Sequence, residues 1–215
     1  MKRIILTALG AALLVFLVFS YALEFVAFDK SFYVQQYKKN NLYAHFSREE
    51  ADKVTDKLLS YLRYEKMNVQ IDTPFFNDKE KRHLVDVKDL LQKESFYCTV
   101  LTFIFVLVVI ILYFSNDLRI TSRITYGTLF FNAGVVGLSM MLTLGILSIL
   151  NFSMVWTSFH RLVFSNNLWM LNPATDNLIV LFPEAFFNAV VTKLFILMGV
   201  VYLFIIACGS WLKAR

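Results

Sequence analysis

Charged side chains are scarce in this sequence. Asp, Glu, Lys and Arg make up 17% of its 215 residues, whereas hydrophobic residues make up 58% and include 22 phenylalanines. Ordinary soluble domains are roughly half apolar and roughly one quarter charged. The balance excludes a domain for which water is the only solvent, and it predicts a protein embedded in a membrane.

The chain also lacks the motifs that mark several large classes of enzyme. It contains no Gly-x-Ser-x-Gly elbow, no His-Glu-x-x-His, no phosphate-binding glycine loop and no paired-cysteine metal motif. Its three histidines and scattered carboxylates show no ligand spacing for zinc. We therefore expect no metal and no nucleotide cofactor.

What the sequence does contain is four long apolar runs, each close to the ~20 residues that cross the hydrocarbon core of a bilayer. We predict four transmembrane spans, at residues 1–28, 96–114, 124–152 and 189–212. The fold class predicted from them is an all-α membrane protein. It is a four-helix transmembrane bundle with an outer, mainly helical extracytoplasmic segment and an interfacial amphipathic segment.

The first apolar run has a second interpretation as a cleavable secretory signal. Met1-Lys2-Arg3 precedes it, and Ser20-Tyr21-Ala22 has the small-x-small pattern of a cleavage site. The run stays apolar beyond that site as far as Phe28, which favours an uncut anchor. Either interpretation predicts export of the segment that follows.

Lysine and arginine in short flanking segments indicate the orientation of the spans. They precede the first span, separate the second from the third and follow the fourth: Lys2, Arg3, Arg119, Arg123, Lys213 and Arg215. We therefore expect cytoplasmic termini, a cytoplasmic loop at 115–123 and a cytoplasmic tail at 213–215, with residues 29–95 and 153–188 outside. The net charge of +5 then reflects topology, and we predict no nucleic-acid binding.

The spans themselves contain little polar chemistry. No charged residue lies near the predicted midplane, which argues against an ion-coupled transporter. Cys98 and Cys208 belong near opposite membrane faces, much farther apart than the ~7 Å between Cα atoms that a disulfide allows. We therefore expect both thiols to be free.

Two helices are predicted in the first outer segment. Ser47 and Glu50 form a capping box before an amphipathic stretch, and Asn77 with Glu80 marks the start of the second helix. Residues 68–76 between them are predicted as an extended linker or a short strand.

The second helix carries His83 and, three residues later, Asp86. If it continued straight into the second span, His83 would stand ~20 Å above Phe96, too high for chemistry at the membrane. We therefore predict a bend between Leu91 and Phe96 that lays this helix across the membrane surface.

The second outer segment is too apolar for a solvated loop and is rich in tryptophan and phenylalanine, so we predict that it lies in the membrane interface. Its polar residues are His160, Arg161, Asn166, Asn167 and Asp176, and Pro183 begins the helix that leads into the fourth span.

His83 and His160 are the candidate catalytic residues. Histidine titrates near neutral pH and acts as a base, an acid or a hydrogen-bond donor. An ordinary structural interpretation stays open, in which His160 sits in the headgroup layer and His83 on a solvated helix. His45 precedes a helix cap and is predicted to be a surface residue.

Two motifs contain these histidines. The first is Pro74-Phe75-Phe76 followed by His83-Leu84-Val85-Asp86-Val87. The second comprises Phe159-His160-Arg161-Leu162-Val163-Phe164, Asn167, Trp169, Asp176, Leu178-Ile179 and Pro183-Glu184-Ala185-Phe186-Phe187. In combination, and with four spans around a large first outer segment, they resemble the bacterial lipoprotein intramolecular transacylase family along the whole chain.

The resemblance implies an acyl shift in a diacylglyceryl lipoprotein at the bacterial cell membrane. The sn-2 acyl chain moves from glycerol oxygen to the α-amine of the N-terminal cysteine, and the product is a lyso-form lipoprotein. His160 is assigned as general base and His83 as acid or oxyanion donor, two roles that the sequence leaves exchangeable. The residues expected to bind or orient substrate are Asp86, Arg161, Asn167, Trp169, Asp176 and Glu184. The expected partners are the diacylated lipoprotein and membrane lipid.

Two other functions compete with this one. A non-enzymatic membrane scaffold or sensor would use the first outer segment to bind a partner. A phospholipid acyltransferase or lipase would act on a similar ester with a similar histidine base.

Overall fold

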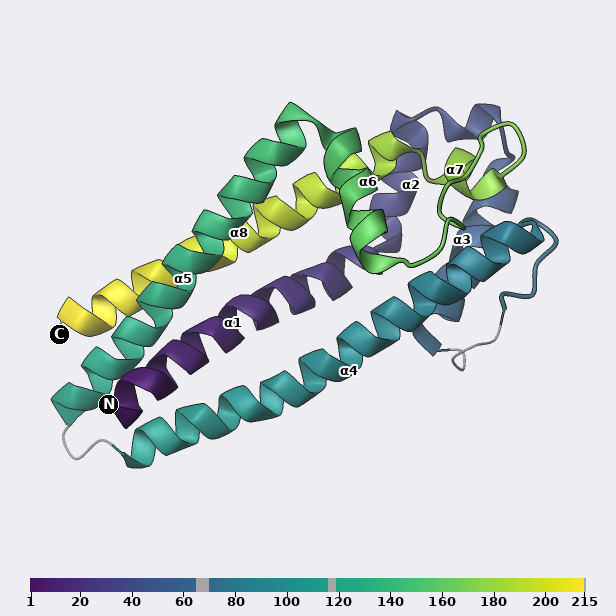
Figure 1. Cartoon of the computed structure of the whole chain (residues 1–215). Coiled ribbons are helices and arrows are strands. Elements are labelled where there is room, and N and C mark those ends of the chain that lie inside the picture. Colours follow the sequence, from purple (N-terminus) through teal and green to yellow (C-terminus); the bar gives the residue numbers. More distant parts are fainter. Residues whose placement is uncertain (65–69, 116–118, 215) are drawn as a thin grey trace. The chain divides into compact units, whose positions relative to one another are not determined.

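The structure, a computed structural model, describes residues 1–64, 70–115 and 119–214. These ranges form α-helices and one 3₁₀ helix joined by turns and irregular segments, without a strand (Figure 1). The elements are α1 (Lys2–Ala27), α2 (Lys30–Lys39), η1 (Leu42–Ala44), α3 (Arg48–Tyr64), α4 (Asp78–Phe114), α5 (Arg119–Leu150), α6 (Phe152–Val163), α7 (Asn177–Leu181) and α8 (Glu184–Ala214). The predicted all-α fold is confirmed.

Four helices, α1, α4, α5 and α8, are long and apolar enough to cross a membrane. The 37 residues of α4 extend over about 55 Å, well beyond the hydrocarbon core, and its apolar part begins near Phe96. The α5 helix ends at Leu150, two residues before the predicted end of the third span, because Asn151 caps the next helix. The protein is a multi-pass integral membrane protein.

The chain divides into two compact units. The first unit consists of Met1–Glu24, Ser95–Ile146 and Lys193–Arg215, which supply the spanning helices. The second unit consists of Phe25–Glu94 and Leu147–Thr192 and contains all three histidines.

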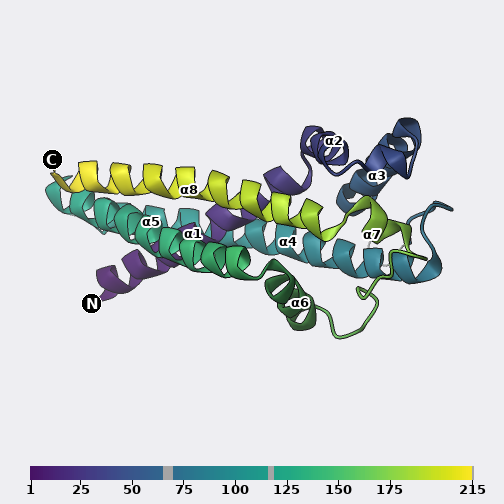
Figure 2. The same ribbon diagram turned by 90° about the horizontal axis from the view of Figure 1, so that it is seen from above.

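In the first unit the four long helices run alongside one another (Figures 1 and 2). Buried apolar side chains from three of them form one cluster: Ala11, Leu13, Val108, Leu112, Leu129 and Ala133. The α8 helix is tied to α1 by Tyr202, whose hydroxyl donates to the carbonyl of Val15 at 3.0 Å. A buried hydroxyl with a partner costs little to bury, so this bond fits an apolar bundle.

The contact between α5 and α8 depends on a glycine. A Cβ added at Gly209 would lie 2.5 Å from the backbone nitrogen of Phe131 and 2.8 Å from the carbonyl oxygen of Gly127, where no side chain can give way. We expect Gly209→Ala to destabilise the bundle by about 1–3 kcal/mol, measured by thermal unfolding in detergent. The matched control is Gly199→Ala on the same helix, where the new Cβ meets only the flexible end of Met141 at 3.4 Å. Equal unfolding temperatures for the two variants would contradict this account.

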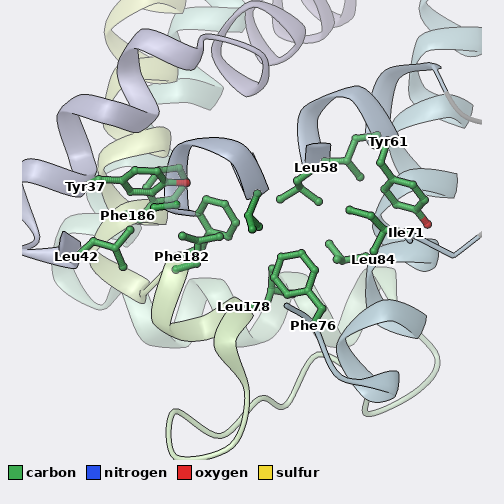
Figure 3. Packing of buried hydrophobic residues seen from close by; sticks show 14 residues of the cluster. Tyr37, Leu42, Leu58, Tyr61, Ile71, Phe76, Leu84, Leu178, Phe182 and Phe186 are labelled. Atoms are coloured by element: carbon green, nitrogen blue, oxygen red, sulfur yellow. The ribbon is translucent and has the colours of Figure 1, made fainter. Parts of the chain in front are cut away.

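The second unit has its own apolar core (Figure 3). It draws on α2, η1, α3, the segment before α4, α4 itself, α7, the residue after it and the start of α8: Tyr37, Leu42, Ala51, Val54, Leu58, Tyr61, Leu62, Ile71, Phe76, Leu84, Leu178, Leu181, Phe182 and Phe186. Figure 3 places Phe76 beside Leu178, so the start of α4 and the segment around α7 are buried together. This shared core packs the start of α4, which carries His83, against the segment around α7.

The structure corrects the prediction for the entry into the second span. The α4 helix runs without interruption from Asp78 to Phe114, so the bend predicted between Leu91 and Phe96 is wrong. The residues between them include neither proline nor glycine and favour helix, so nothing in the sequence produces a kink.

The structure contains the helix start that the sequence predicts at Ser47. The Ser47 hydroxyl oxygen accepts the amide N–H of Glu50 at 3.2 Å, as the predicted cap requires. Before α4, residues 70–77 form turns and irregular backbone with no strand. The first two residues of the predicted linker, 68 and 69, lie outside the described part of the chain.

Candidate active site

The structure brings His83 of α4 next to His160 of α6. The centroids of the two imidazole rings are 6.2 Å apart with an angle of 37° between their planes, and each residue is 6% exposed. The α6 helix that carries His160 is capped by Asn151, whose side-chain oxygen accepts the amide N–H of Met154 at 2.9 Å. Two histidines that are 77 positions apart in sequence therefore form one pair.

Aromatic rings surround His160. The ring of Trp156 lies 4.4 Å away, that of Trp169 4.9 Å, that of Phe159 5.3 Å and that of Phe164 5.7 Å, measured between centroids. These apolar faces remove water from the imidazole and disfavour its charged form. Burial accordingly lowers the pKa of His160, although its bond to the Trp156 carbonyl acts in the opposite direction.

One nitrogen of His160 is already committed to the helix. Its Nδ1 lies 2.8 Å from the carbonyl oxygen of Trp156, one turn earlier in α6. A carbonyl only accepts, so Nδ1 carries the proton and donates it, which leaves Nε2 as an unprotonated acceptor in the neutral ring. This tautomer is the one that a general base needs.

The environment of His83 is still less favourable to charge. Its pKa is lowered to about 4, chiefly by burial; the neighbouring His160 and Lys79 also act to lower it, and Asp86 acts to raise it. Its Nδ1 is buried and has no hydrogen-bond partner among the described residues. Both imidazoles are thus neutral near pH 7, and His83 has a buried nitrogen available for a ligand.

The lowered pKa of His83 predicts a loss of stability in acid. The unfolded chain takes up this proton near pH 6.5 and the folded chain only near pH 4, so the free energy of unfolding falls as the pH is lowered through that window. The slope is about 1.4 kcal/mol per pH unit, or about 3 kcal/mol in all. Denaturant unfolding in detergent at several pH values should show that His83→Gln loses this component, whereas the exposed His45→Gln keeps it. Parallel curves for wild type and His83→Gln would count against the shift.

Asp86 lies on α4, three residues after His83, but its hydrogen bond is to a different residue. Its carboxylate accepts a hydrogen bond from the side-chain amide of Asn166 at 2.9 Å. Asn166 belongs to the site although the motifs singled out its neighbour Asn167, which is exposed and contributes only its carbonyl to a turn. No sequence signal distinguishes these two adjacent asparagines, because only the fold decides which one faces α4.

Hydrogen bonds to Glu80 join the start of α4 to the start of α7, and this residue is 1% exposed. One carboxylate oxygen accepts the amide N–H of Asn77 at 2.6 Å, and the other accepts the amide N–H of Leu178. The Asn77 side-chain oxygen in turn accepts the amide N–H of Glu80 at 3.0 Å. The predicted cap of this helix is therefore present, and it extends to a second segment.

Asp176 adds further hydrogen bonds at the same place. Its carboxylate accepts the side-chain amide of Asn77 at 2.8 Å, the backbone amide of Asn172 at 2.7 Å and the hydroxyl of Thr175 at 3.0 Å, and Lys79 lies 3.7 Å away. Burial acts to raise its pKa, but these donors outweigh burial and lower it. We therefore read Asp176 as a structural anion of the loop after α6.

Arg161 and Glu184 form no part of the contacts around the two imidazoles described above. Arg161 is exposed in the last turn of α6, and Glu184 accepts the hydroxyl proton of Ser153 at 2.6 Å, joining the starts of α6 and α8. Neither forms a hydrogen bond to a histidine within the described ranges. In the same ranges no three His, Cys, Asp or Glu side chains are grouped as metal ligands.

Comparison with known proteins gives the family. A family model described as lipoprotein intramolecular transacylase Lit matches residues 8–187. No curated protein sequence matches the chain. The matched stretch is most of the chain and includes both histidines of the pair.

Solved structures agree in fold. A structure of the membrane integral lipoprotein intramolecular transacylase Lit from Bacillus cereus matches with a TM-score of 0.85 and 21% identity, covering 99% of this chain and 96% of that one. Two further structures of that protein have one histidine replaced, by arginine or by alanine. Each covers 99% of this chain at 20% identity, with TM-scores of 0.80 and 0.81 over 92% and 94% of their own chains. The protein therefore belongs to the lipoprotein intramolecular transacylase family, whose members are acyltransferases.

Proposed function

We propose that this protein moves the sn-2 acyl chain of a diacylglyceryl lipoprotein from glycerol oxygen to the α-amine of the N-terminal cysteine, and so forms a lyso-form lipoprotein. The observation that carries the proposal is the pair of buried imidazoles whose ring centroids lie 6.2 Å apart, one of which has its Nδ1 proton fixed on a backbone carbonyl. The family match supports the same reaction.

His160 acts as the base in this mechanism. An α-amine has an ordinary pKa of ~7.7–8.0, and its nitrogen must lose a proton as it attacks the ester carbonyl carbon. The free Nε2 of His160 accepts that proton when the carbon–nitrogen bond forms. The imidazolium then returns the proton to the glyceryl oxygen as the carbon–oxygen bond breaks, so that an ester and an amine become an alcohol and an amide.

His83 serves as a neutral hydrogen-bond donor. With a pKa lowered to about 4 it is not protonated near pH 7, so it cannot be the cationic acid that delivers the proton. A neutral imidazole N–H directed at the carbonyl oxygen stabilises the oxyanion of the tetrahedral intermediate. The structure thus favours oxyanion donor over acid among the roles that the sequence allowed.

Two features of the site favour transfer over hydrolysis. Attack by the lipoprotein's own amine closes a ring of about eight atoms, and holding its ends together supplies much of the required orientation. The aromatic rings around His160 exclude water from the base. The basic flanks of the spans favour a position of this site on the outer face, where the lipoprotein substrate would be anchored.

The experiment is mass spectrometry of lipoprotein N-termini in cells that express this chain and lack any other N-acylating enzyme. We expect one acyl chain on the cysteine nitrogen and one left on glycerol. A free amine with a missing acyl chain would indicate a lipase, and label arriving from acyl-labelled phospholipid would indicate a phospholipid acyltransferase. Unchanged diacylated lipoprotein would favour the scaffold or sensor and overturn the proposal.

A further inference from the structure

Asn166 is the meeting point of three hydrogen bonds in the loop after α6. Its amide nitrogen donates to Asp86 at 2.9 Å, its side-chain oxygen accepts the amide N–H of Leu168 at 3.0 Å, and its carbonyl accepts the indole N–H of Trp169 at 2.9 Å. Both ends of the side-chain amide are thus fixed, one to α4 and one to its own loop.

One of these bonds holds the indole nitrogen of Trp169. Its ring is 4.9 Å from the ring of His160 and inclined by 32°, so one face of the indole covers the imidazole. Trp169 lies on a loop without helical hydrogen bonds of its own, and the Asn166 carbonyl is the acceptor for its indole N–H. The contact with His160 therefore depends on the shape of the turn at Asn166.

An indole face in this position suits the reaction cycle. When His160 takes a proton it becomes a cation in an apolar site, and the negative face of an aromatic ring stabilises a nearby cation. The same ring shields the imidazole from water. A displaced indole would weaken both effects without removing either histidine.

We propose that Asp86 and Asn166 are positioning residues whose hydrogen bond sets the loop so that the indole of Trp169 covers His160. This inference rests on the proposed function. It assigns Asp86 to the loop rather than to His83, to which it forms no hydrogen bond in the described structure.

An exchange of side chains tests the proposal. Asn166→Asp sets two carboxylates against each other, and we expect kcat for N-acylation to fall about 10- to 100-fold while KM for the lipoprotein stays within about 3-fold. Asp86→Asn keeps only a neutral acceptor for the Asn166 amide, and its kcat should fall by less. The double variant Asp86→Asn, Asn166→Asp restores an amide-to-carboxylate bond with donor and acceptor exchanged, so it should exceed both single variants. Asp72→Asn, an exposed carboxylate before α4, is the matched control.

A second measurement does not depend on activity. Hydrogen exchange of the amides in residues 164–171 should speed up in Asn166→Asp and return toward wild type in the double variant. If the double variant is no better than the single ones in either measurement, Asp86 is needed as a charge at its own position and the proposal is wrong. An inactive wild type would instead contradict the proposed function, and the exchange measurement would still decide this one.

Discussion

Replacing His160 with glutamine is expected to lower the rate of N-acylation by about 10²- to 10⁴-fold, the usual range for loss of a general base. The glutamine keeps a donor for the Trp156 carbonyl and fills similar space, so α6 is expected to fold normally. It has no group that accepts a proton from an amine near neutral pH. The measurement is the rate at which purified protein converts a synthetic diacylated lipopeptide to its lyso form.

The matched control for this variant is His45→Gln, which changes an exposed histidine of the same unit. Its rate should equal that of wild type. Thermal unfolding of all three proteins separates a chemical defect from a folding defect. A His160→Gln protein that folds and retains more than about one tenth of the wild-type rate would show that His160 is not the base.

The pH dependence of the reaction follows from the same groups. With a pKa lowered to about 4, His83 stays neutral between pH 7 and 6, so its titration should not limit the rate in this range; burial shifts the pKa of His160 in the same direction. The substrate amine, with an ordinary pKa of ~7.7–8.0, then determines the rise of the rate with pH in this range.

Much of the fold could be predicted from the sequence because membrane and helix signals are local. Each apolar run is a continuous stretch whose length can be compared directly with the bilayer. The cap residues Asn77 and Glu80 are three positions apart, and the structure contains this cap. Patterns of this kind depend on neighbours in the chain, so one sequence suffices to find them.

The arrangement of the site could be predicted only in part, because it depends on contacts between distant segments. The motifs identified His83 and His160 as candidate catalytic residues. The distance between their two rings, however, depends on how α6 packs near α4. The predicted bend after Leu91 rested on the assumption that His83 had to approach the membrane. In the structure α4 stays continuous and the pair forms within the second unit instead.

Glu80 makes a long-range contact that the local sequence pattern does not predict. Its spacing from Asn77 predicts a helix cap, which alone contributes about 1 kcal/mol. The second carboxylate oxygen, however, accepts the amide N–H of Leu178, 98 positions away. The sequence around Glu80 does not indicate that Leu178 is its partner.

We expect Glu80→Ala to destabilise the second unit by about 3–6 kcal/mol, more than an ordinary cap substitution. A hydrogen bond to a charged group is worth about 1.5–3 kcal/mol, and this carboxylate accepts two from backbone amides at a residue that is 1% exposed. Its loss leaves the buried amide of Leu178 and the partly buried amide of Asn77 without their acceptor. Burial raises the pKa of Glu80 while the two amides act to lower it, and they favour the charged acceptor.

The measurement is hydrogen exchange of the amide of Leu178, because a chain with two units need not unfold in a single step. Glu49→Ala is the control: Glu49 is an exposed acid in the first turn of α3, where its loss should cost less than about 1 kcal/mol. Similar exchange in the two variants would mean that the start of α7 is held by the apolar core around Leu178 alone. Faster exchange in Glu80→Ala only would show that this carboxylate fixes α7 to α4, and with it one end of the loop that carries Trp169 toward His160.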